Sequence, residues 1–321
     1  MSKVIGMGNV LVDVLAQVES ESVLNRLQLP KGSMQLIDAE GYEYLSNVLE
    51  VLPTKRTTGG SAANTMLALA CLGGQTGLIG KTGDDVNGNF FAANCRRCGI
   101  EFVRLIDDQN STGVATVFIT PDGQRTFGTY LGAAANMKES DLKPEFFEGC
   151  DYFYVEGYLV QNHDLIDTAF DMARAAGLKT CLDLASYNIV EQEHGFFEHL
   201  LKKTDLVFAN QEESYAFAHA EPEEALEKLA DYCETAVVKV GSRGAIARRG
   251  SERAEVPAMK VNVVDTTAAG DYFAAGFLYG LTHQRSLQEC ARIGALLSGH
   301  VVQTVGTRLE DAVWKNIKEN L

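Results

Sequence analysis

The segment from Asp265 to Asp271 places two carboxylates around a turn of small residues, Thr-Thr-Ala-Ala-Gly, where an apolar strand pattern gives way to a helical one. Small side chains leave the first N–H groups of a helix accessible, and these unpaired donors bind anions with the help of the helix dipole. A phosphoryl group would fit this turn, and Asp271 would accept the proton of an attacking hydroxyl. Local sequence alone supports a purely structural role for either Asp equally well, because Asp favours helix starts.

Two earlier segments suit the binding of a polyol. Asp13 follows the run Gly-Met-Gly-Asn-Val-Leu-Val, just past a predicted strand, where a carboxylate can hold two vicinal hydroxyls by charge-assisted hydrogen bonds. Asn64 follows Gly59 and Gly60 on a predicted helix. The glycines permit close approach of the backbone to a ligand, and the amide both donates and accepts hydrogen bonds. A tight turn and a plain helix start are the structural alternatives.

Two later segments place glycines and polar residues directly after predicted strands. Asn210 and Glu213 lie in Asn-Gln-Glu-Glu, whereas Lys239, Gly241 and Gly244 lie in Lys-Val-Gly-Ser-Arg-Gly. A helix N-cap with an acidic first turn would use the first pair equally well, and a simple strand-turn-strand would use the glycines of the second segment. Each segment alone is a weak indication of a binding site.

Together, these segments resemble the motifs of the ribokinase-like PfkB carbohydrate kinase family, in the same order along the chain. Residues 265–271 resemble its D-T-x-G/A-A-G-D signature, 58–64 its G-G-x-x-x-N signature, 6–13 its first strand and turn, 210–213 its N-x-x-E motif and 239–244 its K-x-G-x-x-G turn. The likeness covers about residues 4–306, and this order of segments rarely arises by accident. It implies a doubly wound, Rossmann-like, mostly parallel sheet with a small β-rich lid.

The resemblance implies a role for each matching residue. Asp271 would be the catalytic base, and the backbone amides of Ala268, Ala269 and Gly270 would form the oxyanion hole, with Ala268 standing where many members have Gly. The substrate would be bound by Asp13, Gly59, Gly60 and Asn64.

ATP and Mg²⁺ are the cofactors that the resemblance implies. Asn210 and Glu213 would act on Mg²⁺, largely through water, and on the phosphates, because hard oxygen ligands and retained water suit this ion. The residues that would flank ATP are Lys239, Gly241 and Gly244.

Two further expectations concern the same side of the site. The resemblance implies a monovalent cation, K⁺, held by backbone carbonyls near Asp265 and Thr267. Beside the adenine, Ala295 stands where the family often has Asn or His, and Ala cannot hydrogen-bond. Base contacts there must therefore be apolar or come from the backbone, which leaves room for another nucleoside triphosphate.

The elements that must position these residues alternate in type along the chain. Apolar runs rich in β-branched residues alternate with segments of helical period, which is typical of βαβ units and predicts an α/β fold with a parallel sheet. The predicted strands are 3–8, 76–80, 151–155, 179–184, 205–209 and 236–240, and the predicted helices are 61–72, 86–98, 163–176, 223–233, 269–281 and 287–304.

Two stretches interrupt this alternation, at about residues 11–36 and 112–130. In the second stretch, Pro121-Asp122-Gly123 between β-rich runs predicts a hairpin. We expect the two stretches to form one small lid lobe over a site at the carboxyl edge of the sheet, within a single kinase domain of residues 1–321.

Composition limits the partners and the compartment. The formal charge of −15 and the pI near 4.9 disfavour nucleic acid and anionic membranes, because both bind through Lys and Arg. The start of the chain lacks the pattern of a signal peptide and no long apolar run occurs, so we expect a cytoplasmic protein. The seven cysteines are scattered; Cys95 and Cys98 form the one close pair, which we interpret as two thiols rather than a metal site.

The function that these observations predict is ATP-dependent transfer of a phosphoryl group to a hydroxymethyl group of a small sugar or nucleoside. The run before Asp13 and residues 29–34 favour the adenosine-kinase-like branch, while residues 59–64 suit sugar kinases equally well. A non-catalytic sensor of the same fold is the alternative. A Rossmann dehydrogenase is disfavoured, because no G-x-G-x-x-G opens the first predicted helix of this sequence. Four apolar lid residues could stack on a base, although packing within the lid is the more common use of such side chains: Met34, Leu36, Phe118 and Phe127. An exposed lid edge favours a homodimer that pairs the lids.

Overall fold

A computed structural model describes residues 2–122 and 124–321 of the chain. Within these residues the larger sheet has nine strands. The strands from β12 to β6 are parallel, and β13 and β14 continue the sheet antiparallel. In spatial order they are β14 (Glu252–Val256), β13 (Ala245–Arg249), β12 (Thr235–Lys239), β11 (Leu206–Asn210), β10 (Lys179–Asp183), β9 (Tyr152–Glu156), β1 (Lys3–Met7), β5 (Gln75–Gly83) and β6 (Ile100–Asp107).

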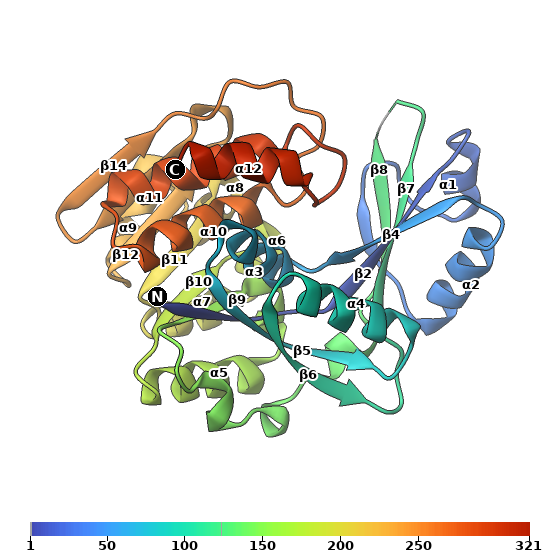
Figure 1. The fold of residues 1–321 in the computed structure, drawn as a ribbon, viewed down its shortest axis with the longest axis horizontal. Coiled ribbons are helices and arrows are strands. Elements are labelled where there is room, and N and C mark those ends of the chain that lie inside the picture. The colour runs from blue at the N-terminus through green and yellow to red at the C-terminus, as the bar shows by residue number, and fades with distance from the viewer. Residues whose placement is uncertain (1, 123) are drawn as a thin grey trace.

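Helices cover both faces of this sheet (Figure 1). Successive residues of a central strand point to opposite faces, so Phe208 of β11 packs into one apolar cluster while Val207 and Ala209 pack into the other. One face carries α3 (Ser61–Leu72), α4 (Val86–Arg97), α10 (Ala269–Thr282), α11 (Leu287–Val301) and α12 (Asp311–Glu319). The other carries α5 (His163–Ala175), α6 (Tyr187–Gln192), α7 (His194–Leu201), α8 (Gln211–Ala218) and α9 (Pro222–Ala230).

A smaller sheet projects from the large one, on the right in Figure 1. Residues of β2 alternate in burial: Val12 and Val14 pack into the apolar cluster of the larger sheet and Ala16 into the small lobe's own core, while Leu11 and Asp13 lie on the opposite face. Its strands, in spatial order, are β3 (Met34–Leu36), β8 (Arg125–Tyr130), β7 (Gly113–Ile119), β2 (Leu11–Gln17) and β4 (Thr54–Gly59). Two helices, α1 (Ser22–Arg26) and α2 (Ala39–Leu49), complete the lobe.

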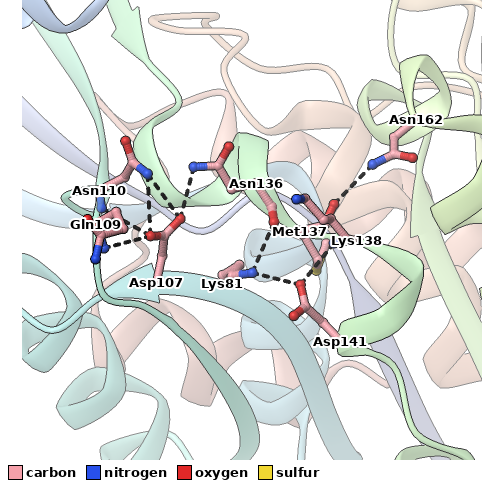
Figure 2. A network of polar contacts seen from close by, with 9 residues as sticks. All are labelled: Lys81, Asp107, Gln109, Asn110, Asn136, Met137, Lys138, Asp141 and Asn162. Atoms are coloured by element: carbon pink, nitrogen blue, oxygen red, sulfur yellow. Dashed lines mark hydrogen bonds and ion pairs between the residues drawn. The ribbon is translucent and has the colours of Figure 1, made fainter.

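The segments that join the two sheets are held by a polar network, which Figure 2 shows. Asp107, at the end of β6, accepts hydrogen bonds from the backbone N–H of Asn110 (3.0 Å) and from the Nδ2 of Asn136 (2.9 Å). Lys81 of β5 donates to the carbonyl of Asn136 (3.0 Å) and forms an ion pair with Asp141 (2.7 Å). These contacts fix both the segment that leads into β7 and the segment that follows β8.

The α/β, doubly wound, mostly parallel architecture predicted from the sequence is confirmed. The predicted strands and helices of the larger sheet form, with ends that differ by a few residues. The smaller sheet contains strands from both stretches, 11–36 and 112–130. Residues 39–59 also belong to the small lobe, because they form α2 and the edge strand β4. Strands β7 and β8 pair antiparallel as a hairpin, although Gly123 of its predicted turn lies outside the described residues.

Candidate active site

A cleft of about 1200 Å³ lies between the two sheets, at the carboxyl ends of the parallel strands. Four neighbouring strands each end in a polar residue that lines it: β9, β10, β11 and β12. Parallel strands end at one edge of a sheet, so polar residues far apart in sequence come together there. These four residues are Glu156, Asp183, Asn210 and Lys239.

Asp271 lies in the first turn of α10 and faces the start of α3 across the cleft floor. Its two carboxylate oxygens accept hydrogen bonds from Ser61 Oγ (2.7 Å) and Asn64 Nδ2 (3.0 Å). Burial raises the pKa of Asp271 to about 6, against the lowering effect of these two hydrogen bonds. The structure therefore holds a weakly basic carboxylate in a fixed orientation, which is what a proton acceptor near neutral pH requires.

The turn before α10 exposes backbone N–H groups. Ala268 adopts the left-handed conformation (φ 61°), and the N–H of Ala269 donates to the Thr266 carbonyl (3.1 Å). In the described part of the chain, the N–H groups of Ala268, Gly270 and Asp271 have no acceptor. The resemblance implies three free amides, but that of Ala269 is not free, because it donates to the Thr266 carbonyl within the turn. Free N–H groups at a helix start are what an anion site at this turn requires.

Lys239 brings a fixed positive charge to this turn. A Cβ atom at Gly270 would lie 3.0 Å from the Lys239 Nζ, which places the ammonium directly beside the free amides. The Nζ also forms an ion pair with Asp183 (2.9 Å). Burial alone would lower the pKa of Lys239, but Asp183 and Glu213 outweigh it and the pKa is raised. The lysine therefore stays charged at neutral pH, and Asp183, which sequence reasoning missed, holds it.

Asn210 and Glu213 form a reciprocal helix cap at the start of α8. The Glu213 carboxylate accepts from the Asn210 N–H (2.7 Å) and Nδ2 (2.6 Å), and Asn210 Oδ1 accepts from the Glu213 N–H (2.8 Å). This is the structural alternative that the sequence left open. Both residues also line the cleft, and burial raises the pKa of Glu213 to about 7. The pair can thus cap α8 and face a ligand at the same time.

Gly241 and Gly244 follow Lys239 along the wall of the cleft. Gly244 has a φ of 108°, and a Cβ there would collide with the Val256 carbonyl of the edge strand. The turn that follows β12 can therefore close only with glycine at this position.

Asp13 stands on β2 over the glycine pair. It faces Thr57 in the pairing of β2 with β4, and a Cβ at Gly59 would collide with its carboxylate. Gly60 has a φ of 96° and packs against the carbonyl of Asn9, so no larger residue would fit. Burial raises the pKa of Asp13 to about 7, while the charges of Arg308 and Arg125 lower it.

Glu156 is a second carboxylate of the cleft that sequence reasoning missed. It accepts hydrogen bonds from the N–H (2.8 Å) and Nδ2 (2.9 Å) of Asn9 and from the N–H of Ala62 (2.7 Å). It thereby joins the turn after β1 to the first turn of α3, where Ser61 and Asn64 contact Asp271. Burial raises the pKa of Glu156 to about 7. The signal that could have found it, and Asp183, is a carboxylate at the end of an apolar strand.

Asp265, in the turn before α10, connects this turn to the small lobe. Its carboxylate forms an ion pair with Arg125 of β8 (2.8 Å) and accepts hydrogen bonds from the N–H groups of Thr267 (3.0 Å) and Gly306 (2.8 Å). Both side chains of the ion pair are only 9% exposed. Because the Asp265 carboxylate is fully engaged, a cation near Asp265 and Thr267 would depend on backbone carbonyls, as the sequence predicts.

Several large apolar side chains of the small lobe line the cleft beside Asp13. Met34 and Leu36 of β3 line the cleft and are 52% and 61% exposed, and Phe127 of β8 lies beside them. Phe118 points the other way, because alternate residues of β7 face the lobe's own core, and it is fully buried there. The expectation that Phe118 could contact a ligand is therefore wrong. Ala295 of α11 lines the far end of the cleft.

No separate metal centre is present in the described residues. Cys95 and Cys98 are free thiols at the end of α4, and no group of three or more His, Cys, Asp and Glu side chains gathers as metal ligands in residues 2–122 and 124–321. No helix of the described chain is long and apolar enough to cross a bilayer.

Comparisons with known proteins match this fold. The family model described as pfkB family carbohydrate kinase matches residues 31–313. The solved structure of an adenosine kinase from Sinorhizobium meliloti is 34% identical, with a TM-score of 0.88 over 100% of this chain and 99% of that one. A probable sugar kinase protein from Rhizobium etli CFN 42 is 33% identical, with a TM-score of 0.89 over 99% and 98%. Adenosine kinase 2 of Arabidopsis thaliana is 25% identical over 94% of each chain.

Proposed function

The chain belongs to the pfkB family of carbohydrate kinases, phosphotransferases with an alcohol group as acceptor, and from this premise we propose that it transfers the γ-phosphoryl group of ATP to a hydroxymethyl group of a small sugar or nucleoside, with Asp271 as the general base. One observation carries the proposal. Asp271, held by Ser61 and Asn64, lies one residue after the free amide of Gly270 and beside the Lys239 ammonium. A proton acceptor and an anion site thus adjoin.

The chain's own residues account for the steps that need a protein group. Asp13, Asn64 and the glycine pair would orient the acceptor, and Asp271 would take the proton of its attacking hydroxyl. The amides of Ala268 and Gly270, with Lys239, would stabilise the charge that develops on the phosphoryl group. Because the anion site and the base are both rigid, positioning and electrostatics would supply most of the rate, as in other phosphoryl transfers.

The residues present fit a nucleoside triphosphate and its metal. The free amides and the fixed charge of Lys239 suit phosphate oxygens, and Gly241 and Gly244 leave space along the wall. Each carboxylate oxygen of Glu213 accepts one hydrogen bond, which leaves lone pairs that can accept hydrogen bonds from the water ligands of Mg²⁺. When bound, Mg²⁺ would neutralise charge on the phosphates. Asn210 would lie beside them, and K⁺ would be held by the carbonyls of Asp265 and Thr267.

The small lobe would act as a lid within a single kinase domain of residues 1–321. Its segments 11–36 and 112–130 carry Asp13, the apolar face and Arg125, which contacts the anion turn through Asp265. Closure over the cleft would exclude water from the transferred group. The open edges of its sheet, β3 and β4, would suit a homodimer that pairs the lids.

The apolar face of the lid favours a nucleoside over a free sugar. Met34 and Leu36 are large apolar side chains that stay exposed within the cleft, which the polar residues Asp13 and Asn64 also line. Such a site suits a ligand with a flat apolar half and a hydroxyl-rich half. A non-catalytic sensor of the same fold is the second candidate, but it would have no use for a base beside an anion site.

A turnover screen tests the proposal. ADP release from ATP with Mg²⁺ and K⁺ is measured against adenosine, inosine, guanosine, ribose and fructose. We expect release that depends on one of these acceptors and is greatest with a nucleoside. Tight binding of an acceptor without any ADP release would favour the sensor, and turnover with sugars alone would overturn the assignment of the lid face.

A further inference from the structure

Arg308 is a partly buried cation without a direct counter-ion. Its Nε donates to Thr57 Oγ1 (3.2 Å) and its Nη2 to the Thr58 carbonyl (3.0 Å), both on β4. The third nitrogen, Nη1, is buried and has no hydrogen-bond partner. Across the residues that the structure describes, no carboxylate lies within ion-pair distance of this guanidinium. Burying such a group costs free energy, so its position requires an explanation.

The hydrogen bonds to β4 place Arg308 next to the proposed acceptor site. Thr57 faces Asp13 in the strand pairing, and the Asp13 carboxylate lies over Gly59 two residues further along β4. The neighbour of Arg308 in sequence, Thr307, lines the cleft. Asp13 is the carboxylate among the groups that raise the pKa of Arg308. Tyr272 and Cys71 also belong to these groups, but burial raises their own pKa values and keeps both neutral.

We propose that Arg308 is a positioning residue that keeps the Asp13 carboxylate charged and aimed at the hydroxyls of the acceptor. The proposal rests on the proposed function, in which Asp13 binds those hydroxyls. A charged carboxylate accepts two hydroxyl hydrogen bonds, whereas a protonated one gives up part of that capacity. Arg308 therefore acts on acceptor affinity through Asp13, without belonging to the machinery that transfers the phosphoryl group.

Among the charges that face Asp13, that of Arg308 lowers its pKa most. Burial raises the pKa of Asp13, Asp271 of α10 raises it further, and Arg308 and Arg125 lower it. Arg125 of β8 is committed to Asp265 by an ion pair. Loss of Arg308 should thus raise the pKa of Asp13 above its value of about 7, so that the ionised fraction at neutral pH falls.

Calorimetric titration of the acceptor between pH 6 and 9 tests the proposal, with adenosine and ribose as probes and kcat measured in parallel. We expect Arg308→Met to weaken acceptor binding about fivefold at pH 7, the effect of raising the Asp13 pKa from about 7 by about one unit, and to approach the wild-type affinity at pH 9. kcat at saturating acceptor should stay within about threefold. Arg308→Lys, which keeps the charge but loses the fork to β4, should give an intermediate shift, and it carries the test if the Met variant does not fold.

A double-mutant cycle separates positioning from simple support of the fold. In an Asp13→Asn background, Arg308→Met should have no further effect on acceptor affinity. The matched control is Arg104→Met on β6, which removes a half-buried arginine with hydrogen bonds to Thr82 and Asn89 and should leave acceptor binding unchanged. Additive losses, or a loss of equal size at pH 7 and 9, would overturn the Arg308 inference and leave the kinase proposal standing. Wild-type affinity in Asp13→Asn would overturn both the Arg308 inference and the role of Asp13.

Discussion

Asp271 combines two demands that oppose each other. As the proposed base it must be ionised, yet burial and the charge of Asp183 raise its pKa to about 6. The hydrogen bonds from Ser61 and Asn64 limit this rise and fix the orientation of the carboxylate. A base of this strength is ionised at pH 7 and still accepts a proton readily, so we expect kcat to fall as the pH drops through about 6.

The same burial predicts that Asp271→Asn makes the protein more stable near neutral pH. The pKa of Asp271 is about 6 when folded and 3.8 when unfolded, so its contribution to stability is full below about 3.8 and is lost as the pH rises through about 6. Replacing Asp271 by Asn removes this loss of stability, so the free energy of unfolding should rise by up to about 3 kcal/mol at pH 8. Asn64 Oδ1, which is buried without a partner, offers an acceptor to the new amide.

Thermal unfolding of Asp271→Asn and wild type between pH 4 and 8 checks this prediction. The Asn variant should melt at a higher temperature at pH 8, and the difference should vanish toward pH 4. A variant that is destabilised equally at both pH values would show that the carboxylate stabilises the fold.

At the residue scale, the sequence motifs identified the cleft residues but not their partners. Asp13, Asn64, Lys239 and Asp271 stand in local patterns, and the structure gathers them in one cleft. Arg125 contacts Asp265, 140 positions away in sequence, and no local pattern marks such a pair. Arg308 was missed for the same reason, whereas Glu156 and Asp183 each end an apolar strand, a local signal that was not used.

The start of α10 shows how an element positions the site. Ala268 caps the helix with φ 61° and ψ 10°, a conformation that costs a residue with a Cβ about 1–2 kcal/mol relative to glycine. The turn directs the N–H groups of Gly270 and Asp271 away from the helix and toward the cleft. The strain at Ala268 is thus tied to the anion site.

Ala268→Gly should relieve this strain without moving the amides. We expect the free energy of unfolding to rise by up to about 1 kcal/mol, because the gain exceeds the added entropy of the unfolded chain, and kcat to stay within about threefold. The control Ala269→Gly places glycine inside the first helical turn and should lower stability instead. Denaturant titration of both variants measures the difference, and equal destabilisation by the two would contradict a strained Ala268.

Elements with a strong apolar pattern were predictable, whereas polar edge elements were not. The central strands are buried on both faces and stand out as apolar runs. Strand β14, Glu-Arg-Ala-Glu-Val, lies at the sheet edge with alternating burial, and its charged residues hide the strand signal. Helix α8 is short and its cap was interpreted mainly as a binding motif, so the sequence did not reveal the helix itself.

The small lobe and the larger sheet meet at the cleft, and a buried ion pair joins β8 of the small lobe to the turn before α10. Arg125 and Asp265 exclude solvent from each other, and Asp265 also orders Thr267 and Gly306. Breaking such a pair leaves a buried charge without a partner, which lowers stability by about 3–5 kcal/mol in comparable sites. The lid position and the shape of the anion turn should therefore change together.

Arg125→Met tests this coupling in the whole molecule. We expect faster amide hydrogen exchange both in β7–β8 and in residues 265–271, together with a lower melting temperature. The matched control is Lys31→Met, which removes exposed ion pairs of the same lid to Glu21 and Asp122 and should change neither region. Faster exchange confined to the lid would show that the ion pair does not order the anion turn.

The most direct test of the account is turnover by Asp271→Asn with the acceptor that the screen selects, measured beside calorimetric binding of the same acceptor. The account predicts that kcat falls about a thousandfold, within the range for loss of a general base, while the acceptor Kd stays within about threefold. Wild-type turnover by Asp271→Asn would contradict the assignment of Asp271 as the base.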